Sequence, residues 1–387
     1  MATAHINPAV LRWAAARAGA ESVDLAADFK KTPDQIEAWL AGSAAPTFVQ
    51  AQKLAKRLRV PFGYLFLADP PVEHLPLPDF RRVHGAAPRE PSVDLRDVLA
   101  DVLRKRDWYR DYRLNAGDGP LQFVGYSSLQ SPISEVARHI ARHLDFESAV
   151  RPQPNRDDFL KAFVSQVEEL EILVMRNGVV RNSTNRPLDP EEFRGFSVAD
   201  PLAPVIFVNN ADSKAAQAFT LAHELAHIWI GEGGISDADP TIPGEASANI
   251  EAFCNEVAGE LLLPWDRIAN RWKNRTVPLE SWITAVSSEF NVSTVMVARQ
   301  LGARGGMSRE EFFSFYETER AKWTSANSSE NSGGNFYWNV PIRNSRLLTR
   351  MVLRSVAASE TLVRDASHLL GVKPANLPKL QESMGGL

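Results

Sequence analysis

The sequence has only one cysteine, Cys254, in 387 residues. A single cysteine cannot form an internal disulfide, so the chain is not one of the disulfide-stabilised secreted proteins. Long apolar runs are also missing, and none approaches the roughly 20 residues that a membrane-spanning helix requires. The first residues lack the basic start and the apolar stretch of a signal peptide. We therefore expect a cytoplasmic protein with no membrane partner.

Neither sign of charge is in large excess. Lysine and arginine number 43, aspartate and glutamate 47, and the formal net charge is −4. This balance gives the chain as a whole no general attraction to nucleic acid. With 44% hydrophobic and 23% charged residues, the composition is typical of soluble globular proteins, and the length allows two or three domains.

What the sequence does contain is a metal-binding motif in Thr220–Ile230, T-L-A-H-E-L-A-H-I-W-I. His223 and His227 are spaced i, i+4, so on a helix their imidazoles lie on the same face and can bind one metal ion. Glu224 follows His223 directly and is placed to act as a base beside the metal. The other residues of the motif are uncharged, as expected of a helix buried behind such a site.

A catalytic zinc ion needs a third protein ligand besides an open position for water. The extended motif with a glycine and a third histidine further along is absent, since Ile230 and Gly233 stand at those positions. The next helical stretch, Glu245–Leu263, should therefore supply the ligand. Its apolar periodicity places Glu251 beside the buried face, with Cys254 one turn further on. Spacing alone leaves both residues as candidates.

Two segments carry a family resemblance. T-L-A-H-E-L-A-H-I-W-I-G, followed by I-E-A-F-C-N-E-V-A-G-E-L-L-L-P, closely resembles the ImmA/IrrE family of zinc metallopeptidases, over about Asn155–Tyr316. The resemblance implies three ligands for Zn²⁺, namely His223, His227 and Glu251. Glu224 then matches the general base, and Cys254 becomes a packed neighbour of the site.

The same resemblance implies a function. The chain would be a zinc metallo-endopeptidase that hydrolyses a regulatory protein, such as a transcriptional repressor or an antitoxin-like partner, in a transcriptional or stress response. Two other classes stay open: a DNA-binding regulator whose zinc domain senses a metal or ligand without cleavage, and an antitoxin-like protein that acts by docking. Salt-dependent DNA binding that is unchanged in Glu224→Gln would favour the regulator.

Residues 1–70 predict an all-α domain. Its five short helices are expected at Pro8–Ala18, Val23–Phe29, Pro33–Ala41, Thr47–Leu58 and Pro61–Phe66. Thr32 is a natural N-cap, and Pro33 suits the first position of a helix. The arrangement resembles a Cro/repressor-type (XRE-like) helix-turn-helix domain, in which Asp34–Leu40 would be the recognition helix.

The charges of this domain leave its partner open. Asp34, Gln35 and Glu37 stand near the start of the expected recognition helix, where DNA contacts favour basic or amide side chains. The domain has eight basic and six acidic residues, so its electrostatic attraction to the phosphates of DNA is weak. DNA binding and protein docking, including a homodimer with a second copy of the chain, therefore both remain open.

Residues 71–154 are expected to link and brace the two domains. The segment Pro70–Arg81 is proline-rich and extended. Val93–Tyr112 and Ser131–Leu144 have helical periodicity. Six acidic residues are interleaved with nine basic ones between positions 81 and 113, which favours a solvated helix face over a surface for nucleic acid.

His139 and His143 repeat the i, i+4 spacing of the motif. No carboxylate lies between them, and two arginines flank them where a metal site needs uncharged neighbours. We interpret this pair as solvated or interfacial histidines rather than ligands.

Residues 155–322 predict a zincin-like metallopeptidase domain with a small sheet. Ile172–Val180 is expected to form a hairpin that turns at Asn177–Gly178, and Pro204–Asn209 a strand directly before the motif helix. In zinc peptidases of this class that strand would be a sheet edge on which the substrate backbone lies as an added strand. Helices are expected again over Ser281–Leu301.

Residues 323–387 are expected to form a linker and a helical C-terminal region. Thr324–Asn335 is rich in serine, asparagine and glycine, and helices are expected at Ser345–Ala357 and Thr361–Leu370. The pattern R-D-A-S-H-L-L-G-V-K-P-A-N-L resembles a second helix-turn-helix element, with a helical cap on the peptidase domain as the other interpretation. The whole chain is thus predicted to be α+β, with an all-α domain at its start and helices at its end.

Overall fold

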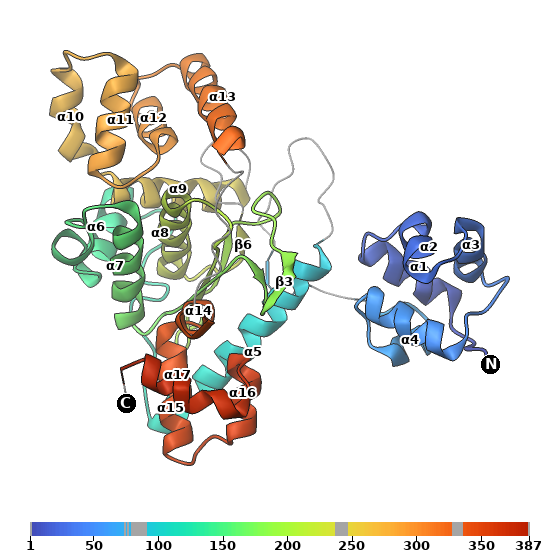
Figure 1. Cartoon of the computed structure of the whole chain (residues 1–387). Coiled ribbons are helices and arrows are strands. Elements are labelled where there is room, and N and C mark those ends of the chain that lie inside the picture. The colour runs from blue at the N-terminus through green and yellow to red at the C-terminus, as the bar shows by residue number, and fades with distance from the viewer. Residues whose placement is uncertain are drawn as a thin grey trace. The chain divides into compact units, whose positions relative to one another are not determined.

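The computed structural model describes residues 2–72, 75, 77–78, 91–236, 247–326 and 336–385, and it is mixed α+β with a small sheet and many helices, as predicted (Figure 1). The chain divides into two compact units, Met1–Pro76 with Arg89–Leu99, and Leu77–Pro88 with Ala100–Leu387. The division falls within helix α5 (Val93–Ala116). Among the described residues, no helix combines the length and the apolar character needed to cross a bilayer.

Residues 2–72 of the N-terminal unit form four α-helices and one 3₁₀ turn. They are α1 (Pro8–Arg17), α2 (Ser22–Phe29), α3 (Pro33–Ala41), α4 (Phe48–Arg57) and η1 (Phe62–Phe66). The five predicted helices are therefore confirmed, except that the last is a 3₁₀ turn. Thr32 caps α3 in a reciprocal capping box with Gln35, which satisfies amides that the first helical turn leaves unpaired. The core of the unit is apolar and includes Leu11, Leu25, Ile36, Trp39, Leu54, Leu58 and Leu65.

The larger unit contains a four-stranded sheet with the order β1-β5-β4-β6. Its strands are β1 (Leu173–Asn177), β4 (Gly195–Val198), β5 (Val205–Asn209) and β6 (Ile235–Ser236). Strand β1 runs parallel to β5, and β4 is antiparallel to both of its neighbours.

The predicted hairpin over Ile172–Val180 is wrong. Strand β1 pairs with β5, whereas β2 (Val179–Val180) pairs with β3 (Ser183–Pro187) in a separate two-stranded sheet. All five residues of β1 are buried, which is typical of a strand covered on both faces and paired in parallel. A turn signal at Asn177–Gly178 therefore ends β1 without folding the chain back onto it.

The predicted sheet edge is also wrong. Strand β5 does form directly before the motif helix, but it lies between β1 and β4, and all five of its residues are buried. The edge beside β4 is formed by β6, where the amide of Ile235 donates to the carbonyl of Pro78 at 2.9 Å. Which strand lies at an edge depends on pairing between distant segments, and no local pattern encodes it.

Two helices, α7 (Arg156–Glu169) and α8 (Lys214–Ile230), pack against the sheet and against each other. Helix α9 (Ser247–Leu262) packs on α8, and α6 (Ile133–His143) lies against both (Figure 1). A π-helical turn, η2 (Phe146–Val150), joins α6 to α7. Helix α8 is therefore enclosed by other elements, which explains why nearly all of its residues from Ala215 to Trp229 are buried.

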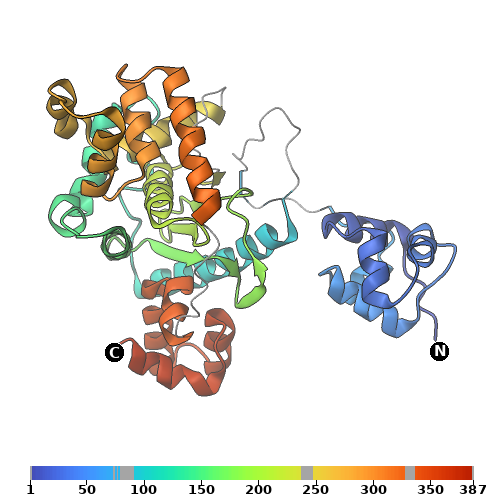
Figure 2. The same cartoon turned by 45° about the horizontal axis from the view of Figure 1, so that its top comes forward.

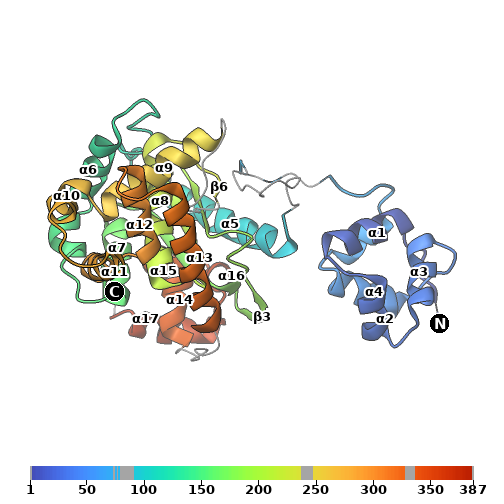
Figure 3. The same ribbon diagram turned by 90° about the horizontal axis from the view of Figure 1, so that it is seen from above.

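Helices complete the larger unit after the sheet. The first group is α10 (Trp265–Lys273), α11 (Leu279–Glu289), α12 (Thr294–Ala303) and α13 (Arg309–Ala326). The second is α14 (Phe336–Asn344), α15 (Arg346–Ala357), α16 (Val363–Leu370), η3 (Pro374–Asn376) and α17 (Leu377–Ser383). Helices α14 and α15 pack against β1, and α12 packs against α13 (Figure 3).

The linkers and helix ends depart from prediction in places. The two helices expected in the C-terminal region correspond to α15 and α16. Helix α13 continues to Ala326, past the predicted start of the linker Thr324–Asn335, whose remainder lies outside the described residues. Helix α9 begins at Ser247, and Glu245, where this helix was expected to start, also lies outside them.

Candidate metal centre

The motif helix α8 has defined ends and a buried middle. The hydroxyl of Ser213 accepts from the amide of Ala216 at 3.3 Å and caps the start. Gly231 ends the helix in the left-handed conformation, with φ 74°. Between these ends, His223, Glu224 and His227 are fully buried. Burying three ionisable side chains costs free energy, and hydrogen bonds, ion pairs or a bound metal ion must offset that cost.

Two helices bring the candidate ligands together. The Nε2 atoms of His223 and His227 lie 3.0 Å apart. From α9, Glu251 places Oε2 3.2 Å from Nε2 of His223 and Oε1 3.2 Å from Nε2 of His227. Within the described part of the chain, these three residues are the one group of at least three metal-binding side chains whose ligand atoms all lie within 4.8 Å of one another.

Hydrogen bonds on the far side of each imidazole set its tautomer. Nδ1 of His223 lies 3.0 Å from Oδ1 of Asn255, and Nδ1 of His227 lies 2.9 Å from the backbone oxygen of Glu232. Both partners are oxygen acceptors, so each Nδ1 carries the proton. Each Nε2 of a neutral ring then presents a lone pair to the other Nε2 and to the carboxylate.

Lone pairs that converge on a carboxylate repel one another unless a cation lies among them. Oε1 of Glu251 is buried and receives no hydrogen bond. Burial raises the pKa of the Glu251 carboxyl, but positive charge on the two neighbouring imidazoles, when they are protonated, outweighs burial and lowers that pKa to about 2, so the carboxylate stays ionised beside a cation. The residues therefore fit a divalent metal, and two imidazoles with one carboxylate form a donor set that suits zinc.

Glu224 lies beside a strand that leaves room for it. A Cβ atom at Gly195 on β4 would stand 3.3 Å from Oε1 of Glu224, 2.5 Å from Cγ2 of Thr220 and 2.8 Å from the backbone oxygen of Phe207. No larger residue fits there, so Gly195 allows α8 to approach the sheet closely. The sequence prediction did not single out this residue, although a glycine within an apolar strand is a sign of such an approach.

Cys254 lies on α9 next to the cluster but outside it. The thiol is fully buried and adjoins His227, and burial raises its pKa. Its sulfur is not among the converging ligand atoms, whereas the carboxylate of Glu251 reaches both imidazoles. Of the two candidates that spacing left open, the structure brings Glu251 to the histidines.

The second histidine pair belongs to an aromatic cluster. His139 stacks on Tyr126 with 4.0 Å between ring centroids, and its Nδ1 accepts from Nε1 of Trp229 at 2.9 Å. Burial lowers the pKa of His139, and the nearby charges of His143 and Arg142 lower it further. The pair packs against Trp229 at the end of α8, and among the described residues it belongs to no group of three metal-binding side chains.

Two segments of the chain match known protein families. Residues 168–301 match Peptidase_M78, the IrrE N-terminal-like domain. This IrrE-like segment, residues 168–301, contains the whole cluster and supports a metallopeptidase of the ImmA/IrrE type with a metal cofactor. Residues 344–383 match DUF8813, a domain of unknown function. A comparison with curated proteins returned no match.

Proposed function

We propose that this protein is a zinc-dependent endopeptidase that cleaves a regulatory protein, such as a repressor or an antitoxin-like partner. The observation that carries the proposal is the convergence of His223, His227 and Glu251 beside Glu224 in the IrrE-like segment. The regulatory nature of the substrate rests on the resemblance to the ImmA/IrrE family and on the separate N-terminal unit.

The chain's own residues provide the ligands. His223 and His227 would hold the ion through Nε2, and Glu251 through its carboxylate, while Asn255 and the Glu232 carbonyl fix the rings. A zinc ion held by these residues would act as a Lewis acid and make water a nucleophile near neutral pH.

Glu224 is the residue that would move the proton. It directly follows His223 on α8, and its carboxylate interacts electrostatically with His227 and Cys254 next to the cluster. In the proposed reaction this carboxylate accepts the proton of the attacking water and passes it to the leaving amine. Gly195 lets α8 lie close to β4, because a side chain at that point would collide with Thr220 and crowd Glu224.

The test compares proteomes of cells that carry the wild type or Glu224→Gln. The glutamine variant keeps the size and the burial of the side chain but cannot accept the proton. We expect a small set of proteins whose abundance falls with the wild type and not with the variant. Glu256→Gln, which changes an exposed glutamate on α9, is the matched control and should behave as the wild type. Equal proteomes for wild type and Glu224→Gln would contradict the proposal.

The choice of substrate is proposed to lie with the N-terminal unit. Asp34, Gln35 and Glu37 are exposed on α3, where a DNA-reading helix would need basic or amide side chains. Two acidic residues on that face favour docking of a protein over tight binding to phosphate. The DNA-binding regulator without cleavage remains the competing hypothesis.

A further inference from the structure

A cavity of about 450 Å³ lies away from the metal cluster, between the end of α5 and the turn that follows α15. Figure 2 shows this end of α5 passing beside the C-terminal helices. Its lining residues are Trp108, Asp111, Tyr112, Asn115 and Ala116 from α5, and Ser355, Glu360 and Thr361 from α15 and the turn. None of them touches the metal cluster or is used in the proposed function.

One face of α5 forms the first wall. Trp108, Asp111, Tyr112 and Asn115 follow the i, i+3, i+4, i+7 spacing that places side chains on one side of a helix. The rings of Trp108 and Tyr112 stack with 5.4 Å between centroids and 17° between planes, and both are half-buried. A stacked aromatic pair of this kind offers a flat, electron-rich surface to a planar or cationic ligand.

A hydrogen-bonded turn forms the second wall. The buried hydroxyl of Ser355 lies 3.3 Å from Oε2 of Glu360 and 2.8 Å from the hydroxyl of Thr361. The amides of Glu360 and Thr361 both donate to the backbone oxygen of Ser355, at 2.9 and 3.3 Å. These bonds hold the Glu360 carboxylate in place before any ligand binds, which lowers the entropy cost of binding.

The electrostatics of this cavity favour a cation. Its lining contains two carboxylates, Asp111 and Glu360, and no lysine, arginine or histidine. Helices α5 and α15 both end at it, at Ala116 and Ala357, and the partial negative charge of a helix C-terminus adds to the attraction. Among the described residues, the carboxylate of Glu360 accepts from the hydroxyl of Ser355 and not from a cationic side chain.

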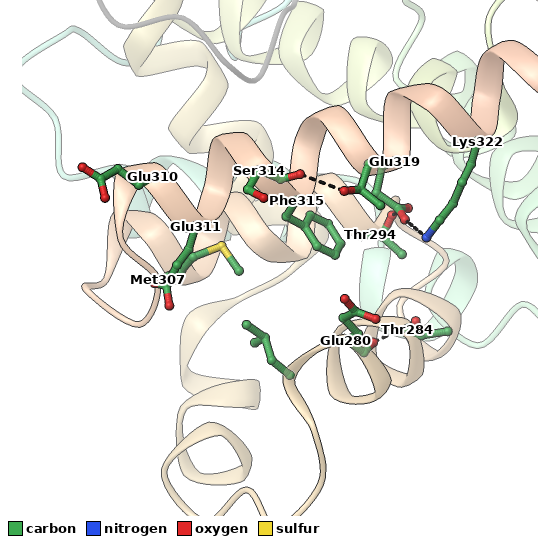
Figure 4. A pocket seen from close by; sticks show the side chains of 12 residues that line it. Glu280, Thr284, Thr294, Met307, Glu310, Glu311, Ser314, Phe315, Glu319 and Lys322 are labelled. Carbon is green, nitrogen blue, oxygen red and sulfur yellow. Dashed lines mark hydrogen bonds and ion pairs between the residues drawn. The ribbon is translucent and has the colours of Figure 1, made fainter.

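A second cavity of similar volume has carboxylates that are partly neutralised by a cation of the chain. It lies between α11, α12 and α13, and its lining includes Glu280, Glu310, Glu311 and Glu319 (Figure 4). There Glu319 already pairs with Lys322 at 2.6 Å and also accepts from Thr294, so part of the acidic charge is neutralised within the chain. The cavity at α5 has fixed acidic charge together with a stacked aromatic surface, and no internal cation occupies it.

We propose that the cavity between α5 and α15 binds a guanidinium group. A guanidinium is planar and permanently charged, so it can stack on the Trp108–Tyr112 pair while its N–H groups donate to Glu360 and Asp111. An arginine side chain of a partner protein and free arginine share this chemistry. A phosphate or carboxylate group would find no partner among the lining residues, because the lining carries no basic side chain, so the guanidinium is the group that the cavity recognises.

Calorimetric titration of the full-length protein tests this proposal. The ligands are L-arginine and a capped Gly-Arg-Gly peptide, each compared with the citrulline counterpart, which has the same shape and no charge. We expect binding of at least one arginine ligand, and binding of its citrulline counterpart about tenfold weaker or undetectable, because the charge-assisted bonds are lost. Preference for the peptide would identify a protein side chain as the source, and preference for L-arginine a small molecule.

Variants locate the binding. Glu360→Gln and Trp108→Ala should each weaken binding about tenfold, since one removes the fixed charge and the other the stacking surface. Glu382→Gln and Trp338→Ala change an exposed glutamate and an exposed tryptophan outside the cavity and serve as matched controls. Citrulline binding equal to arginine binding, no binding of either arginine ligand at millimolar concentration, or unchanged affinity in both cavity variants would overturn the proposal.

Discussion

Metal binding by the two imidazoles depends on the two oxygen atoms that accept their hydrogen bonds. Asn255 and the backbone oxygen of Glu232 keep a proton on each Nδ1, and only then do both Nε2 lone pairs face Glu251. Asn255 comes directly after Cys254 on α9 and four residues after Glu251. One helix therefore supplies both the carboxylate and the residue that orients His223.

The first residue-scale prediction separates Glu251 from Cys254. His223→Ala, His227→Ala and Glu251→Ala should each lose most of the approximately one zinc ion per chain, since a single-zinc site rests on three protein ligands. Cys254→Ser should keep its zinc, because the thiol lies outside the converging atoms. Metal analysis of purified protein measures this, with Glu256→Gln as control. Loss of zinc in Cys254→Ser with retention in Glu251→Ala would mean a His-His-Cys site instead.

The second prediction concerns Asn255 as a positioning residue. Asn255→Ala removes the acceptor from Nδ1 of His223 and should weaken zinc affinity about 10- to 100-fold, as is usual for the partner of a ligating histidine. Asn255→Asp keeps an oxygen acceptor and should restore much of that affinity. Competition with a zinc chelator gives both values. If alanine and aspartate weakened zinc binding equally, a role in general packing would replace the positioning role.

At the scale of elements, Glu168 connects the sheet layer to the C-terminal helices. It lies in the last turn of α7 and is 8% exposed. Its Oε1 accepts from the hydroxyl of Ser345 at 2.5 Å and from the amide of Leu347 at 3.4 Å, both at the start of α15. Burial raises the pKa of Glu168 to about 7, and the bonds from Ser345 and Leu347 act in the opposite direction without cancelling it.

This raised pKa predicts a pH-dependent stability. The folded state keeps the Glu168 proton up to about pH 7, whereas the unfolded chain releases it near the ordinary value of 4.5. The contribution of Glu168 to the free energy of unfolding is therefore full below pH 4.5 and is lost as the pH rises towards 7. Glu168→Gln should flatten this decline and be more stable than the wild type at pH 8.

The measurement is the urea midpoint of unfolding between pH 5 and 8. Glu169→Gln changes the next residue of α7, which is exposed, and should keep the pH dependence of the wild type. An identical pH dependence in Glu168→Gln and Glu169→Gln would show that Glu168 is not the titrating group.

At the scale of the whole molecule, the N-terminal unit and the unit with the metal cluster have separate cores. Tethering a binding module to a peptidase raises the effective concentration of the peptidase near whatever the module binds. Because α3 exposes Asp34 and Glu37, we expect protein docking or weak DNA binding with a shallow dependence on salt.

The prediction at this scale is a deletion. Removing residues 1–70 should leave the zinc content unchanged, since all three candidate ligands lie in the larger unit. Cleavage of the true partner, identified through the Glu224→Gln comparison, should become slower. Rates of partner cleavage by full-length and truncated protein provide the measurement. Equal rates would show that the N-terminal unit does not select the substrate.

The sequence by itself predicted correctly those features that depend on neighbouring residues. The spacing of His223 and His227 on an apolar segment predicts a helix with both imidazoles on one face, because helical period and burial follow from neighbouring residues. Thr32 and Pro33 predict the start of α3 for the same reason, and the structure confirms it. The choice of Glu251 over Cys254, however, came from family resemblance and not from spacing.

Only the tertiary structure decided what depends on segments far apart in the chain. The parallel pairing of β1 with β5, the internal place of β5, the space that Gly195 leaves for Glu224 and the bond from His223 to Asn255 all join residues separated by long stretches. Local patterns report whether a residue is buried but not which neighbour covers it. Which carboxylate reaches both imidazoles therefore depends on how α9 packs on α8. The spacing of residues within either helix does not determine that packing.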